Sequence, residues 1–251
     1  MRADEIEKMN RLDDWYWWFV GNRELVSGLV GGACGKIAGA GRLRILDVGC
    51  GTGAMLSRLG TYGRAFGADR SVEALGFCRQ RGAELLCQCN ATQLPFPDGT
   101  FQIVVASHIL EHVAEDDSVL EELDRVLAPG GRMIATIPAH RFLWSAHDVA
   151  LSHKRRYSRR EVADKIRKAG FVVERVTYTN FFIFPIVVAL RLFKKVFRPA
   201  AADPKTDLVP MPALLNRALV GLYRCEAWIL ARINVGFGVN LACIARKGSE
   251  A

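Results

Sequence analysis

The chain has 251 residues, of which half are hydrophobic and 24% are charged. These values exclude a disordered or collagen-like chain and leave ample material for a buried core. Lysines and arginines number 34 against 26 aspartates and glutamates, giving a net charge of +8 at pH 7. Such an excess favours an anionic partner, for example nucleic acid, phospholipid or phosphate.

Two features bear on the compartment. The seven cysteines show no zinc-type pairing, and the Cys87-Gln88-Cys89 spacing alone is a weak metal signal, so we expect free, mostly buried thiols and no metal site. Residues 1–10 lack the apolar core of a secretory signal, and the longest apolar run, 181–190, falls short of the roughly 20 residues that span a bilayer. We therefore expect a cytoplasmic protein.

Residues 1–30 predict one or two helices that carry the cluster Trp15-Tyr16-Trp17-Trp18-Phe19. The three tryptophans of this cluster cannot all face one core. At least one of them should line a substrate entrance or an interface.

From residue 43 onward, short apolar runs alternate with amphipathic ones. This alternation predicts a parallel sheet covered by helices on both faces. The expected strands are 43–48, 65–68, 84–89, 101–106 and 132–137, and the expected helices are 54–59, 72–81, 117–127 and 160–169.

The C-terminal third predicts two more strands, 171–178 and 239–245, separated by about 60 residues of apolar and basic helix. One helix is expected at 181–197, broken near Pro185 and ended by Lys194, Lys195 and Arg198, and another at 214–233. Apolar faces edged with cations suit a membrane interface. Packing of both helices into a homodimer or onto the main domain is the alternative.

The sequence Ile45-Leu-Asp-Val-Gly-Cys-Gly-Thr-Gly53 ends the first predicted strand, and Asp69 ends the second. Glycines allow a tight turn close to a ligand, and an acidic residue about 20 positions later suits ribose hydroxyls. Together they predict a nucleoside-containing cofactor. A nicotinamide dinucleotide is disfavoured because Ala54-Met55-Leu56 replaces the expected continuation of the phosphate-binding turn.

ILDVGCGTG, Asp69 in FGADRS, NATQLPFPDGTFQIVVASHILEHV and LAPGGRMIATIP follow one another between residues 43 and 138. In this order they resemble the class I S-adenosylmethionine-dependent methyltransferases, in particular the ubiquinone-type branch that acts on small molecules. The resemblance implies an α/β Rossmann-like sheet of seven strands, the last antiparallel, with S-adenosylmethionine as cofactor and S-adenosylhomocysteine as product.

The resemblance also implies roles by position. Asp47 and the glycine turn should hold the methionine part, Asp69 the ribose, and Asn90 with Ala91 the adenine. Asn90 and Gln102 depart from the usual aspartates, and we expect Gln102 to be structural. The full set of expected cofactor contacts is Arg23, Asp47, Gly49, Cys50, Gly51, Gly53, Asp69, Arg70, Asn90, Ala91 and Ser107.

Proton removal from an acceptor favours histidine near neutral pH. The predicted catalytic residues are His108, at the end of the fourth strand, and His147 and His153, which flank Asp148 in a loop over the cofactor. Solvated loop histidines are the alternative for the last two. For His112 a capping or surface role is favoured.

Two groups of basic side chains each have two interpretations. Arg23 could reach the cofactor carboxylate or lie on a helix surface. The run from Lys154 to Tyr157, with Arg159 and Arg160, could clamp a phosphate of the acceptor or form a solvated loop.

We expect one methyltransferase domain over 1–251, with a helical cap (1–38), a cofactor-binding core (39–178), a helical insertion (179–236) and a last strand (237–251). The expected reaction is O-methylation of a hydrophobic or lipid-linked small molecule at the inner membrane face. A soluble metabolite as acceptor, and a non-catalytic membrane-associated subunit, are the alternatives. Ser107-His108-Ile109-Leu110 stands where amine-methylating DNA enzymes carry Asn-Pro-Pro-Tyr, so no nucleic-acid partner is expected.

Overall fold

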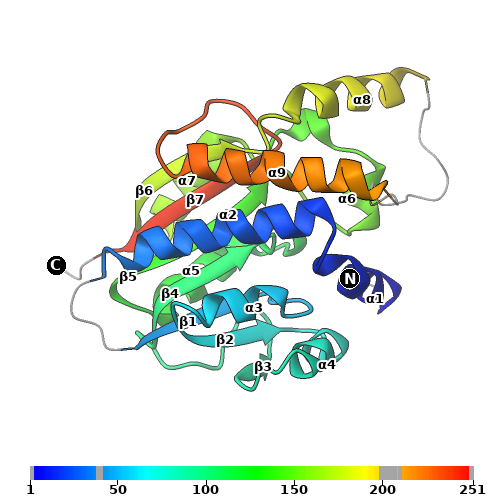
Figure 1. The fold of residues 1–251 in the computed structure, drawn as a ribbon. Coiled ribbons are helices and arrows are strands. Elements are labelled where there is room, and N and C mark those ends of the chain that lie inside the picture. The colour runs from blue at the N-terminus through cyan, green and yellow to red at the C-terminus, as the bar shows by residue number, and fades with distance from the viewer. Residues whose placement is uncertain (1–2, 38–41, 198–207, 209–210, 249–251) are drawn as a thin grey trace.

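A computed structural model describes residues 3–37, 42–197, 208 and 211–248. The chain forms a seven-stranded sheet of order β3-β2-β1-β4-β5-β7-β6 between two layers of helices (Figure 1). Strands β1 to β5 are parallel, whereas β7 pairs antiparallel with both β5 and β6. This arrangement confirms the predicted fold class.

The elements follow the predicted alternation. The strands are β1 (Leu43–Val48), β2 (Gly63–Asp69), β3 (Leu86–Gln88), β4 (Phe101–Ser107), β5 (Leu127–Pro138), β6 (Phe171–Thr179) and β7 (Asn240–Lys247). The helices are α1 (Ala3–Asp13), α2 (Trp17–Cys34), α3 (Ala54–Leu59), α4 (Val72–Gln80), η1 (Leu110–His112), α5 (Asp116–Val126), η2 (Arg141–Leu143), α6 (Ala146–Ala150), α7 (Arg159–Lys168), α8 (Phe184–Phe197) and α9 (Ala213–Leu230).

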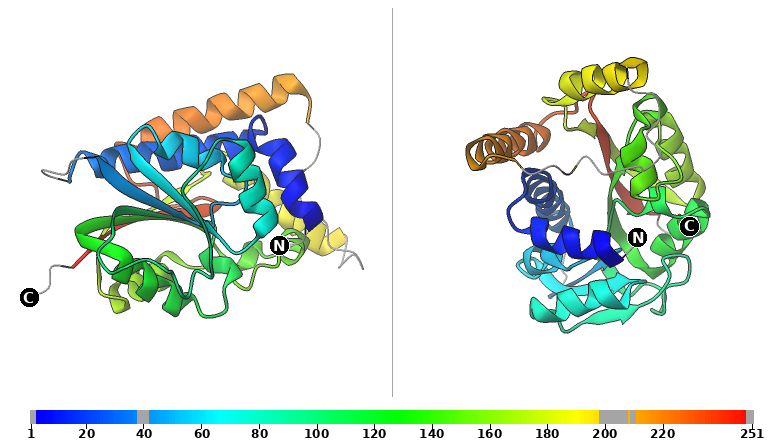
Figure 2. Two further views of the ribbon diagram at one scale, coloured as in Figure 1. Left: turned by 90° about the horizontal axis from the view of Figure 1, so that it is seen from below. Right: turned by 90° about the vertical axis from the view of Figure 1, so that its right-hand side faces the viewer.

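Alternate residues of the central strands serve the two faces of the sheet. Val104 and Ala106 of β4 pack with apolar residues of α5 and α7, whereas Ile103 and Val105 pack with α2 and α9. All four of these β4 side chains are completely buried. Such burial on both faces is typical of a parallel strand between two layers of helices. The two further views show the helices on opposite sides of the sheet (Figure 2).

The strand directions bring several chain ends to one edge of the sheet. Strands β1, β2 and β4 are parallel neighbours, so they end at the same edge. Because β7 runs the opposite way, its first residue, Asn240, pairs with Pro138 at the end of β5 and with Thr179 at the end of β6. Every connection that leaves this edge can therefore contribute to one site.

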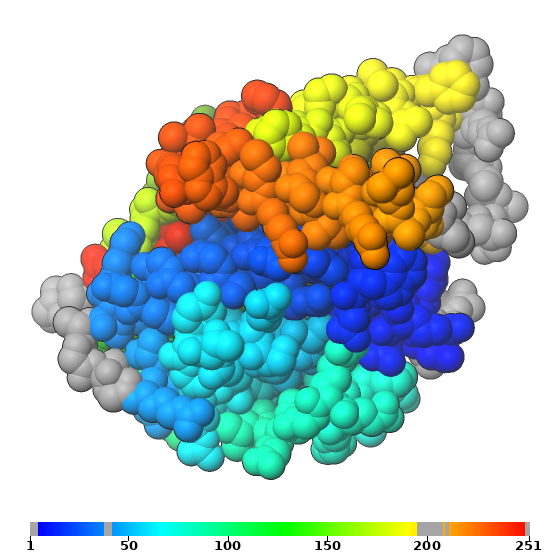
Figure 3. Space-filling view, in the orientation of Figure 1, coloured from blue at the N-terminus to red at the C-terminus, as the bar shows by residue number. Residues whose placement is uncertain are grey.

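The segment between β6 and β7 differs in part from expectation. Pro185 does not break a helix, because α8 begins at Phe184 and Pro185 lies in its first turn, where a backbone N–H has no partner within the helix. Helix α9 lies along α2 in the space-filling view (Figure 3). The side chain of Lys195, the whole of Arg198 and the expected boundary at residues 38 and 39 lie outside what the structure describes.

No helix among the described residues combines the length and the apolar character that crossing a membrane requires.

Candidate active site

A cavity of about 720 Å³ opens at the carboxyl edge of the sheet. Residues from α1, α2, the turn after β1, the ends of β2 and β4, the loop after β5 and α8 line it. Of the predicted site residues it brings together Arg23, Asp47, Gly49, Cys50, Gly51, Asp69, Arg70, Asn90, Ala91, Ser107, His108, His147 and His153.

Gly53 does not line this cavity. It adopts a positive φ of 86° immediately before α3, and a Cβ there would lie 2.8 Å from Sγ of Cys78. Gly53 therefore serves the turn into the helix rather than a ligand contact.

The turn after β1 is held against the end of β2. Gly49 and Gly51 both have positive φ, and the backbone N–H of Gly51 donates to Oδ2 of Asp69 at 3.0 Å. The other carboxylate oxygen of Asp69 accepts from the backbone N–H of Ser71 at 2.9 Å. The carboxylate is thus fixed at the cavity wall, with lone pairs left over for ligand hydroxyls.

Acidic groups gather beside this turn. Asp47 is buried, and burial together with the charges of Asp69 and Asp13 raises its pKa to about 8. Burial also raises the pKa of Asp13, although Thr52 and Arg23 act in the opposite direction. A cationic ligand would relieve this concentration of carboxylates, and S-adenosylmethionine carries both a sulfonium and an ammonium group. The residues present therefore fit that cofactor.

Arg23 is not a helix-surface arginine. Its Nη1 donates to the backbone oxygen of Asp13 at 2.9 Å and to Oδ1 of Asp13 at 3.1 Å, and its side chain is only 13% exposed. Asp13 also accepts a hydrogen bond from the hydroxyl of Thr52. Arg23 and Asp13 thereby join α1 and α2 to the turn after β1.

His108 and Glu111 form a pair at the end of β4. Nδ1 of His108 lies 2.9 Å from Oε1 of Glu111, which is fully buried. His108 has a positive φ of 55°, and its ring lies 5.2 Å from that of Trp18. In the described part of the chain, Nε2 of His108 and Oε2 of Glu111 are buried and have no hydrogen-bond partner.

A second histidine and carboxylate pair joins α6 to the loop that follows it. Nδ1 of His153 lies 3.0 Å from Oδ1 of Asp148, and Nε of Arg156 donates to the same oxygen at 2.7 Å. Although burial raises the pKa of Asp148, the hydrogen bonds from His153 and Arg156 outweigh it and lower that pKa well below its usual range. The side chain of His153 is 7% exposed, so it is not a solvated loop histidine.

The structure corrects the prediction that His112 has a capping or surface role. It is half-buried and lines the cavity, and burial lowers the pKa of its ring to about 4. The centroid of its ring lies 4.7 Å from the ring centroid of His153. The sequence interpretation also missed Glu111, and the only available signal was an acidic residue three positions after His108 at a strand end.

The basic run after α6 contains both paired and exposed cations. Nη1 of Arg155 donates to Oδ1 of Asp116 at 2.8 Å, and Arg156 is buried against Asp148. The hydroxyl of Tyr157 donates to Oδ2 of Asp116 at 2.8 Å. Intramolecular carboxylates thus engage Arg155 and Arg156, which argues against both alternatives for these two. Lys154, Arg159 and Arg160 are exposed, and Lys154 also lines the cavity.

The aromatic cluster behaves partly as expected. Trp17 and Trp18 line the cavity, whereas Trp15 is 45% exposed and its indole N–H donates to the backbone oxygen of Arg11.

Two further predictions concern residues outside the cavity or only partly in it. Gln102 has a structural role, because its side-chain oxygen accepts from the backbone N–H of Arg44 at 2.9 Å. All seven cysteines are free, but only Cys50, Cys78 and Cys243 are buried.

The family described as "Methyltransferase domain" matches residues 46–135. This match covers a little over a third of the chain and agrees with the methyltransferase resemblance found in the sequence. The match to this domain confirms S-adenosylmethionine as the expected cofactor. The acidic groups that line the cavity fit the same cofactor.

Two curated relatives carry names of the expected branch. The "Ubiquinone/menaquinone biosynthesis C-methyltransferase" of Cellvibrio japonicus is 34% identical over 42% of this chain and 48% of its own length. The "Demethylmenaquinone methyltransferase" of Thermus thermophilus is 38% identical over 36% of this chain and 45% of its own length. The chain thus spans less than half the length of each relative.

The fold agrees with solved methyltransferase structures. A methyltransferase from Thermotoga maritima described as S-adenosylmethionine-dependent aligns with a TM-score of 0.61 and 19% identity, covering 98% of this chain and 97% of its own. At this identity the likeness shows the fold.

Proposed function

We propose that this protein is an S-adenosylmethionine-dependent methyltransferase that acts on a hydrophobic small molecule. The observation that carries the proposal is that one cavity contains all the expected cofactor contacts except Gly53, together with an apolar wall. Methyl transfer needs chiefly the placement of an acceptor atom in line with the sulfonium methyl group, and one continuous cavity provides room for both reactants.

The apolar wall comes from segments outside the matched domain. Trp17 and Trp18 of α2 line the cavity. Ile183, just before α8, and Val187, in its first turns, line it as well. Aromatic and aliphatic walls bind ring or chain hydrocarbon through burial of apolar surface. This lining supports an acceptor with a substantial hydrocarbon part over a small polar metabolite.

The atom that receives the methyl group has two candidates. Transfer to oxygen is the expectation from the sequence, whereas the names of the two curated relatives favour carbon of a quinone precursor. A hydroxylated ring with an apolar substituent is a substrate for either reaction, and both require loss of a proton. His108, His147 and His153 at the cavity are the groups predicted to take that proton.

Asp69→Ala tests the cofactor site. Loss of a carboxylate that accepts from ribose hydroxyls should weaken binding of S-adenosylhomocysteine about tenfold to a hundredfold in calorimetric titration. Glu84→Ala, which removes an exposed carboxylate elsewhere, is the matched control. Unchanged affinity in the Asp69 variant would contradict the site assignment.

Radiolabelled methyl transfer into a membrane-containing lysate tests the acceptor class. Label that partitions into butanol supports a hydrophobic acceptor, and nuclear magnetic resonance of the product distinguishes a methyl group on oxygen from one on carbon. Label found only in water-soluble metabolites would overturn the hydrophobic acceptor.

We also propose that the protein is cytoplasmic and works at the inner membrane face, with α8 as the contact. Ile186, Leu190, Leu192 and Phe193 of α8 are all more than half exposed, and Arg191 and Lys194 lie between and beside them. Apolar side chains flanked by cations suit an anionic lipid surface. The same helix lines the cavity through Val187, so an acceptor dissolved in the membrane would enter beside it.

A further inference from the structure

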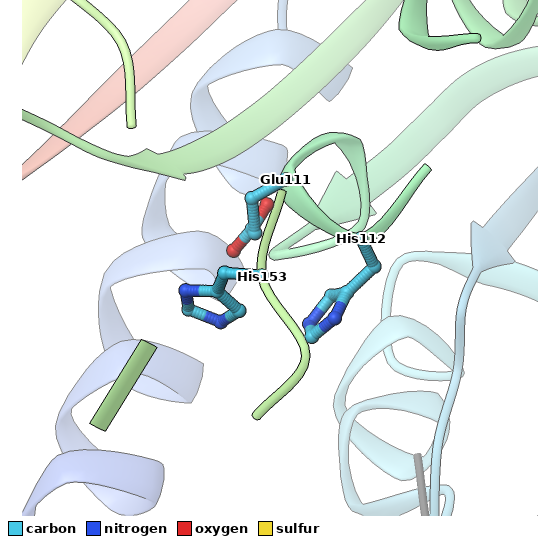
Figure 4. Close-up of side chains that lie close together, drawn as sticks. All are labelled: Glu111, His112 and His153. Carbon is cyan, nitrogen blue, oxygen red and sulfur yellow. The ribbon is translucent and has the colours of Figure 1, made fainter. Parts of the chain in front are cut away.

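We infer that Glu111, His112 and His153 form a binding site for one divalent transition-metal ion of the zinc class. Each of these residues offers one ligand atom, and the three atoms lie within 4.8 Å of one another. Two ligands of a tetrahedral zinc ion, at about 2.1 Å each, are about 3.4 Å apart, so small movements of these side chains toward a common ion would complete a coordinated set. Figure 4 shows the three side chains gathered around one space, with Glu111 and His112 coming from η1 and His153 from the loop after α6.

The carboxylate of Glu111 has an unused oxygen. Glu111 is 0% exposed, and its Oε1 is occupied by His108, but its Oε2 has no hydrogen-bond partner among the described residues. A buried carboxylate oxygen without a partner is unfavourable by several kcal/mol unless hydrogen bonds or a cation compensate it. A metal ion at this place would satisfy that oxygen.

The ring of His153 is oriented as metal-binding histidines usually are. Its Nδ1 faces Oδ1 of Asp148, which Arg156 keeps ionised and in place at 2.7 Å. Asp148 is itself fixed, because its Oδ2 accepts from the backbone N–H of Ser145 at the start of α6. A carboxylate that accepts from Nδ1 leaves Nε2 with its lone pair directed away, and this pairing recurs behind metal ligands.

The donor set selects the kind of ion. Two imidazole nitrogens and one carboxylate suit Zn²⁺, Co²⁺ or Fe²⁺, whereas Mg²⁺ and Ca²⁺ prefer sites made of oxygen alone. Three protein ligands leave at least one position open. His112 and His153 both line the large cavity, so the open position would face the space assigned to the acceptor.

An oxygen of the acceptor is the ligand class that suits this open position. As a metal ligand His153 has no free ring nitrogen, so proton removal falls to His108 or His147. This use of the ion rests on the proposed methyl transfer, whereas binding of the ion does not. The cluster contains none of the predicted cofactor contacts, so the two sites can be tested separately.

The test is titration of the metal-free, reduced full-length chain with Co²⁺, followed by visible absorption and calorimetry. We expect one ion per chain, with visible bands but without the near-ultraviolet charge-transfer band of a cobalt thiolate, since the seven free cysteines could otherwise bind Co²⁺. Zn²⁺ should displace Co²⁺, and a tenfold excess of Mg²⁺ should not.

The variants Glu111→Gln, His112→Gln and His153→Ala should each lower the affinity for Co²⁺ at least tenfold. Asp148→Asn should lower it about tenfold to a hundredfold, because it removes the group that orients His153. His140→Asn is the matched control, since His140 lies outside the set of cavity-lining residues and asparagine tolerates its positive φ of 62°.

Circular dichroism identifies any variant that fails to fold, and the half-buried His112→Gln keeps the test decisive in that case. Absence of Co²⁺ binding, or equal affinity in the wild type and His112→Gln, would overturn the metal site. S-adenosylhomocysteine binding measured on the metal-free protein distinguishes this failure from failure of the proposed function.

Discussion

Helices α8 and α9 come from one insertion and have similar compositions, yet they relate to the molecule in different ways. Helix α9 lies along α2 and buries Asn216, Tyr223, Glu226 and Leu230. Helix α8 exposes Ile186, Leu190, Leu192 and Phe193 and contributes Val187 to the cavity. Apolar spacing with interspersed cations therefore does not distinguish a helix that anchors a segment from one that borders a site.

Buried polar contacts hold α9 in place. The side chain of Asn216 accepts from the backbone N–H of Trp17 at 2.8 Å and donates to the backbone oxygen of Trp15 at 2.7 Å. The hydroxyl of Tyr223 donates to Oδ1 of Asn180 at 3.2 Å, and Glu226 accepts from the backbone N–H of Asn180. These contacts fix α9 against α2 and against the end of β6.

The largest expected effect is that of Tyr223→Ala. Tyr223 is 3% exposed and its ring packs directly on Gly21, where a Cβ would lie 2.2 Å from it. Removing this ring should lower the free energy of unfolding in urea by about 3 to 5 kcal/mol. Trp228→Ala on the exposed side of the same helix should change it by less than about 1 kcal/mol. Equal effects of the two variants would mean that α9 is not anchored through this face.

Glu226 should make stability depend on pH. Burial raises its pKa to about 7 from its usual 4.5, despite backbone hydrogen bonds that act in the opposite direction. Because the pKa of the folded state is the higher one, the stabilisation is complete below pH 4.5 and is lost as pH rises through 7. The interval between 4.5 and about 7 corresponds to about 3 kcal/mol.

Urea denaturation of the wild type and Glu226→Gln between pH 5 and 8 measures this contribution. The variant should lose less stability with rising pH than the wild type. Asp47, whose pKa is also raised, adds a dependence of the same sign to both proteins, so the difference between the two curves reports Glu226. Parallel curves would contradict the assignment.

The smallest effect on stability is expected on α8. Leu190→Ser combined with Phe193→Ser should change the free energy of unfolding by less than about 1 kcal/mol, since both side chains are more than half exposed. The same double variant should lose sedimentation with anionic vesicles at low salt. Leu214→Ser, at an 82% exposed position of α9, is the control. Equal loss in the control would show that α8 has no special role at the lipid surface.

The sequence predicted the parts of the site that are contiguous or follow a strand end. The glycine turn after β1 and Asp69 were accessible because a turn and a strand boundary leave local signals. The pairing of His153 with Asp148, five positions away, was not predicted because it depends on the local fold of α6 and on burial. The closeness of His153 to His112 was not predicted because these residues are 41 positions apart. The strand β5 begins at Leu127, earlier than predicted. The prediction began at 132 because the Pro129-Gly130-Gly131 stretch is typical of a turn.

The two ends of the insertion meet at a single point of the sheet. Nδ2 of Asn240 donates to Oδ1 of Asn180 at 2.7 Å, and Asn240 begins the strand that pairs with both β5 and β6. The hydrogen bond between Asn180 and Asn240 therefore joins the two ends of the segment from 181 to 239. The segment returns to the sheet at the point where it leaves it, so its length does not set the register of β6 against β7. Under the proposed function, changes in this segment would reshape the space for the acceptor and leave every predicted cofactor contact in place, since none of those contacts lies within it.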